Sequence, residues 1–63
     1  MERWKLTYVP RMAMLGEVPA KEYVHEAEAE TEDLEEQAIV DKLHHIINEH
    51  TSGDGVLTAA EKI

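Results

Sequence analysis

KEYVHEAEAET, residues 21–31, decides the fold, because it is compatible with two different secondary structures. Alanine and glutamate favour a helix by intrinsic propensity. The apolar and acidic positions nevertheless alternate with a period of two, which indicates a strand, and periodicity is the stronger signal. We therefore predict a strand over 21–30. The alternative is an N-terminal strand followed by one long helix over 20–50. The two alternating sets are Tyr23, His25, Ala27, Ala29 and Val24, Glu26, Glu28, Glu30.

The preceding segment, ERWKLTYV at 2–9, also alternates and predicts a strand. Its aromatic and β-branched content suits a strand, and Pro10 ends it because proline donates no ladder hydrogen bond. Trp4, Leu6 and Tyr8 share one face, whereas Arg3, Lys5 and Thr7 share the other. If the two strands pair in antiparallel fashion, Arg3 and Lys5 lie near Glu26 and Glu28. Such cross-strand pairs each contribute about 0.2–1 kcal/mol.

Residues 10–20 contain two prolines and a glycine and predict a long loop. The loop is unusually apolar, and its Met12 and Met14 suit adaptable recognition of another protein.

Residues 32–50 predict an amphipathic helix, with Thr31 or Asp33 as its N-cap. Gly53 or Gly55 ends it, and a short strand follows over 55–62. In that strand we expect Val56 and Thr58 on one face, and Leu57 and Ala59 on the other. The apolar stripe of the helix comprises Ile39, Val40, Leu43, Ile46 and Ile47.

The predicted fold is α+β: a single domain over 1–63, with a small antiparallel sheet packed on one helix in the order ββαβ. One helix covers only one face of such a sheet. The 63 residues include no cysteine, and small domains without disulfides often gain stability by association, so we expect a homodimer. The sequence shows no signal peptide and no apolar run of membrane-spanning length. We expect a cytoplasmic protein with no membrane partner.

The net charge of −8 arises from one block, residues 22–36, which holds eight acidic and no Lys or Arg residues. Phosphate backbones would repel such a chain, which argues against direct nucleic-acid binding and favours a basic protein partner. The candidate interaction residues are Glu22, Glu26, Glu28, Glu30, Met12 and Met14.

The stretch HTSGDGVLTAAE, residues 50–61, resembles the calcium loop of the EF-hand family. With Gly55 as the glycine of the sharp turn, Ser52, Asp54 and Glu61 fall at positions where that family supplies oxygen ligands. His50 departs from the family at the first position, and two residues after Glu61 leave no exiting helix. We therefore expect a turn without a cofactor, and keep a calcium-responsive module as the alternative.

Catalysis has little support, because the chain has no cysteine and its one serine, Ser52, lies in a glycine turn. We expect a non-enzymatic interaction protein. Short acidic chains of this layout resemble accessory proteins of bacteriophages and mobile elements. That resemblance implies binding to, and inhibition of, a host nucleic-acid-binding protein. A structural subunit of a larger assembly is the third possibility.

Overall fold

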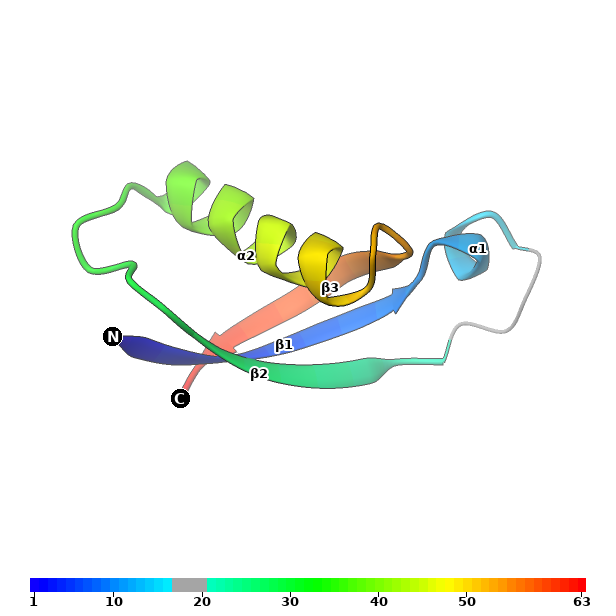
Figure 1. Ribbon diagram of the computed structural model, residues 1–63, viewed down its shortest axis with the longest axis horizontal. Helices are drawn as coiled ribbons and strands as arrows, with labels where there is room; N and C mark the ends of the chain where they lie inside the picture. The colour runs from blue at the N-terminus through cyan, green and yellow to red at the C-terminus, as the bar shows by residue number, and fades with distance from the viewer. Residues whose placement is uncertain (17–20) are drawn as a thin grey trace.

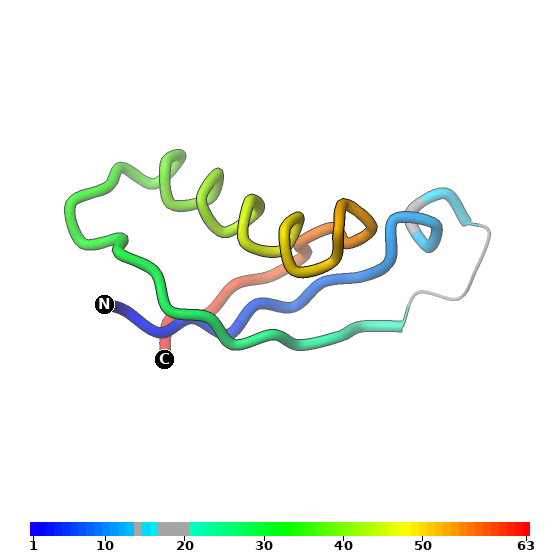
Figure 2. The backbone as a smooth tube through the Cα atoms, viewed as in Figure 1, coloured from blue at the N-terminus to red at the C-terminus, as the bar shows by residue number. Residues whose placement is uncertain are grey.

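The computed structural model describes residues 1–16 and 21–63 and has the predicted α+β architecture (Figure 1). Three strands form one antiparallel sheet in the order β2-β1-β3, and the longer helix, α2, packs on one face of it (Figure 2). The chain order ββαβ is therefore confirmed, with a short helix, α1, added after the first strand. The elements are β1 (Glu2–Pro10), α1 (Arg11–Met14), β2 (Tyr23–Ala29), α2 (Glu36–His50) and β3 (Gly55–Lys62).

The ambiguous stretch forms β2, so the alternative of one long helix is wrong. Arg3 lies opposite Glu28 and Lys5 opposite Glu26 in the antiparallel pairing, as predicted. The period of two prevails over helix propensity because alternate residues of β2 face the helix-covered side of the sheet. Ala29, at the end of this set, is buried.

The core is small and lies between α2 and the central strand β1. Leu6 and Ile47 have no exposed surface, and Leu43 packs with them. Each such side chain contributes about 1.5–3 kcal/mol through burial. The partly buried side chains around this cluster are Trp4, Tyr8, Ala27, Ile39, Ile46 and Leu57.

The start of α2 differs from the prediction. Glu35 is the N-cap residue, and no side chain caps the helix, so neither Thr31 nor Asp33 has the predicted role. Thr31 is instead buried, and both its backbone N–H (2.8 Å) and its hydroxyl donate to Glu2 Oε1. These bonds tie the segment after β2 to the start of β1. They also lower the pKa of Glu2 from its ordinary value of 4.5, with the side-chain bond as the largest cause.

The end of α2 is a tight turn held by Thr51. Its hydroxyl donates to Ile47 O at 2.7 Å and accepts from the Gly55 N–H at 2.8 Å. Gly53 has a φ of +86°, a conformation that glycine adopts without strain. A Cβ on Gly55 would lie 2.7 Å from Thr51 Cγ2, so glycine is needed there for space.

A bulge in β3 changes the predicted faces of this strand. Tyr8 pairs with Leu57 and Thr7 with Ala59, so Thr58 is the extra residue between the two pairs. Leu57 therefore packs against the core, whereas Ala59 lies opposite Thr7 on the uncovered face. The prediction that Leu57 and Ala59 share a face is wrong, because simple alternation does not include a bulge.

Candidate protein-interaction surfaces

The uncovered face of the sheet holds two of the predicted interaction residues, but in ion pairs. Arg3 Nε contacts Glu26 Oε1 at 3.1 Å, and Arg3 Nη1 contacts Glu28 Oε1 at 3.5 Å. Lys5 lies between Glu26 on β2 and Glu61 on β3 in the strand register. The acids of this face are thus partly compensated by two cations, as the predicted strand pairing implied, and the face is less negative than the charge count of residues 22–36 indicates.

The strongest uncompensated charge lies in the connection from β2 to α2. Five of the seven residues from 30 to 36 are acidic, and we call this set the acidic end: Glu30, Glu32, Asp33, Glu35 and Glu36. All five are exposed, and none takes part in a salt bridge within the described residues. Lys42 approaches them only through a bond from its Nζ to the backbone oxygen of Glu30, at 2.9 Å.

An apolar side chain is exposed among these acids. Leu34 retains 39% of its surface. Its amide donates to Thr31 O at 3.2 Å, which fixes a turn in the connection. The acidic end therefore combines negative charge with one apolar contact point, a combination suited to a partner with basic and apolar side chains.

The predicted methionine loop lies at the other end of the molecule, which is 39 Å long (Figure 1). Residues 11–14 form α1, and the exposed fractions of Met12 and Leu15 are 47% and 71%. The Met14 side chain and residues 17–20 lie outside the described part of the chain. Glu22 is exposed just before β2, at this same end. The structure therefore separates Met12 from the acidic end, and the predicted interaction residues do not form one surface.

The residues of the calcium alternative are also separated. Ser52 and Asp54 lie in the turn after α2, whereas Glu61 is extended in β3 opposite Lys5. The segment that follows the turn is a strand rather than a helix. Within the described residues, no group of three or more His, Asp or Glu side chains could hold a metal ion. The stretch 50–61 is a helix end, a turn and a strand, as the main prediction stated.

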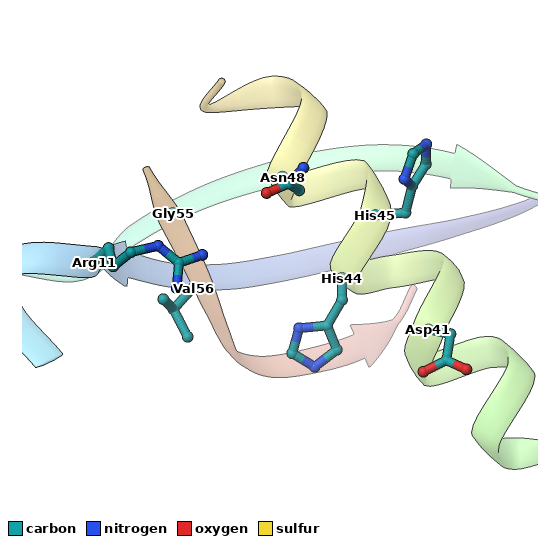
Figure 3. Close-up of a pocket in the computed structure, with 7 residues that line it drawn as sticks. All are labelled: Arg11, Asp41, His44, His45, Asn48, Gly55 and Val56. Atoms are coloured by element: carbon teal, nitrogen blue, oxygen red, sulfur yellow. The ribbon is translucent and has the colours of Figure 1, made fainter. Parts of the chain in front are cut away.

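A hollow of about 430 Å³ lies between α2 and the start of β3 (Figure 3). Arg11 reaches it from α1 and donates from Nε to Gly53 O at 3.1 Å. Asp41 also lines the hollow and accepts a bond from Gln37 Nε2 at 3.0 Å. The positive charge of Arg11 and the negative charge of Asp41 therefore both border the hollow. The sequence did not indicate this feature, because its lining residues come from two segments far apart in the chain, residue 11 and residues 41–56. They are Arg11, Asp41, His44, His45, Asn48, Gly55 and Val56.

A second unpredicted feature is a stack of rings at the C-terminal end of α2. His25 of β2 stacks on His50 with ring centres 3.7 Å apart, and Tyr8 stacks on Tyr23 at 5.7 Å. Tyr8 meets His50 edge to face at 6.0 Å, which joins the two pairs. Burial, and then the charge of the neighbouring His50, lower the pKa of His25 below its ordinary value of 6.5. Both causes disfavour the protonated form of His25 in the folded protein.

No helix in the described part of the chain is long and apolar enough to cross a membrane. No protein-family model, no curated protein and no solved structure matches this chain. Its function is therefore inferred from its own residues.

Proposed function

We propose that this chain is a non-enzymatic interaction protein that binds a basic protein partner through its acidic end. The observation that carries the proposal is the exposure of Leu34 among five carboxylates that have no cationic partner within the described residues. Uncompensated charge steers a basic partner toward this end and sets the orientation of approach. The apolar side chain adds a contact that excludes water once the partner is in place.

The proposed binding site is the acidic end rather than the carboxylates of β2. Glu26 and Glu28 already interact with Arg3, so binding a partner there would exchange one ion pair for another. Exposed ion pairs contribute about 0–1 kcal/mol, and such an exchange provides little net affinity. The carboxylates of the acidic end lose no such partner on binding. Inhibition of a nucleic-acid-binding host protein is the form of this function that the resemblance to phage accessory proteins suggests.

The experiment compares two variants with similar losses of charge. Glu32→Gln/Asp33→Asn/Glu35→Gln removes three of the five charges of the acidic end, and Glu22→Gln/Glu26→Gln/Glu28→Gln removes three charges on and beside β2. The probe is a basic peptide with leucine among its lysines and arginines, titrated calorimetrically at low and at physiological salt. We expect the first variant to lose binding and the second to retain most of it. Leu34→Ala should weaken binding with no change of charge.

Equal loss in both triple variants would mean that the peptide responds to net charge alone, and would refute the acidic end as the site. Binding that survives both triple variants would refute an electrostatic contact altogether.

A further inference from the structure

The outer edge of β3 has no strand partner within residues 1–16 and 21–63, because β1 lies on its other side. We propose that this edge pairs with β3 of a second copy of the chain. The two strands run antiparallel and join two three-stranded sheets into one sheet of six strands. The residues of β3 from Thr58 onward are exposed, so a second strand can approach them.

The hydrogen-bond pattern shows which backbone groups are available. The Ile63 N–H donates to Arg3 O at 2.9 Å, so Ile63 faces β1. Backbone groups alternate in direction along an antiparallel strand, and therefore Glu61 and Ala59 also face β1. The N–H and C=O groups of Ala60 and Lys62 point away from β1, toward the open edge. These are the groups that a second copy would pair with.

Charge favours β3 over β2 as the edge that associates with itself. The other free edge, β2, carries Glu26 and Glu28 and is flanked by Glu22 and Glu30. Antiparallel pairing of two β2 strands would bring acids against acids, which destabilises a strand pair. β3 carries one acid, Glu61, and one base, Lys62, so its edge has no net charge.

Symmetry and side-chain size indicate the register. When the two-fold axis passes through Ala60, Ala60 meets its own copy, Glu61 lies opposite Ala59, and Lys62 lies opposite Thr58. No carboxylate then faces a carboxylate, and the central residues are small. A two-fold axis perpendicular to the sheet keeps both α2 helices on the same face. The joined sheet provides hydrogen-bond partners for an edge that otherwise presents unpaired backbone groups.

The first measurement is molecular mass by sedimentation equilibrium from micromolar to millimolar concentration, with amide hydrogen exchange at both limits. We expect the mass to double, and the amides of Ala60 and Lys62 to gain protection as it does. The amides of Ala59 and Glu61 bond to β1 and should be protected at both limits. A mass of one chain at millimolar concentration would overturn the proposal, and so would a dimer in which the Ala60 and Lys62 amides exchange freely.

Charge variants at Ala59 test the register. Ala59 is exposed and lies opposite Glu61 of the second copy, twice in each dimer. Ala59→Glu should weaken the dimer and Ala59→Lys should strengthen it, each by about 2- to 30-fold for two cross-strand pairs. Val24→Glu and Val24→Lys make the same charge changes on β2 and are the controls. If the two Ala59 variants dissociate alike, or no differently from their Val24 controls, the register is wrong.

Discussion

Thr51→Val should destabilise the fold by removing one hydroxyl at the turn between α2 and β3. The side chain keeps its shape, but the Gly55 N–H loses its acceptor at 2.8 Å. Gly55 is buried, so water does not readily replace that acceptor. The Ile47 carbonyl loses the hydroxyl bond but keeps a bond from the Thr51 backbone N–H at 3.0 Å. The main cost is therefore one unsatisfied donor, about 1–3 kcal/mol.

That cost is large for a domain of this size. A chain of 63 residues has a free energy of unfolding of roughly 3–9 kcal/mol. A loss of about 2 kcal/mol lowers the midpoint of thermal unfolding by about 8–16 °C. Urea unfolding is the assay, followed by the fluorescence of Trp4, the one tryptophan, which packs against the core. The urea concentration at the unfolding midpoint should fall, while the slope of the free energy of unfolding with urea concentration stays unchanged.

Thr58→Val is the matched control, because it removes a hydroxyl that donates to Thr7 O at 3.2 Å on the exposed part of β3. We expect it to change stability by less than about 0.5 kcal/mol. Equal losses in the free energy of unfolding would mean that removing any threonine hydroxyl costs the same. That result would refute the explanation that the cost arises from the buried Gly55 N–H at the turn.

Two further predictions concern calcium and pH. Millimolar calcium should leave the amide NMR signals of Gly53 and Gly55 unshifted, because Glu61 is held in β3 opposite Lys5. Saturable shifts that the Glu61→Gln variant abolishes would support the EF-hand alternative instead. The pKa of His25 is lowered on folding, so the unfolded chain takes up this proton first as the pH decreases. The contribution of His25 to stability is therefore fully present above the ordinary pKa of 6.5 and is lost as the pH decreases below it. His25→Phe should flatten that fall in urea titrations, whereas loss of stability through the lowered pKa of Glu2 begins only as the pH falls below 4.5. An unchanged slope in His25→Phe would assign the fall to other groups.

The elements whose periodicity is regular were predictable from the sequence. Alternation placed Arg3 and Lys5 opposite the acids of β2, and the apolar stripe identified Leu43 and Ile47 as core residues. The start of α2 was missed because Thr31, a residue type that favours N-caps, bonds to Glu2 from a strand that is remote in sequence. Propensity describes only local contacts, and here a long-range bond takes precedence.

The candidate surfaces were only partly predictable for a related reason. The composition showed an acidic block, and strand alternation placed Arg3 and Lys5 near Glu26 and Glu28. Neither pattern showed that the carboxylates between β2 and α2 form no salt bridge within the described residues. The hollow beside Arg11 and the stack of His25 on His50 likewise join segments far apart in the chain. A charge count gives the net charge of the chain, and the strand register determines which of its carboxylates have a cation nearby.

The small core also bears on how a partner would affect the protein. A partner present at a hundred times its dissociation constant stabilises the folded chain by about 2.7 kcal/mol. That gain is similar to the expected cost of Thr51→Val and is a large share of the total stability. Because Thr51 and the acidic end lie at opposite ends of α2, the turn variant should still bind, and the partner should restore most of its lost stability (Figure 1). The increase in the free energy of unfolding at a known partner concentration would then report the affinity of the acidic end.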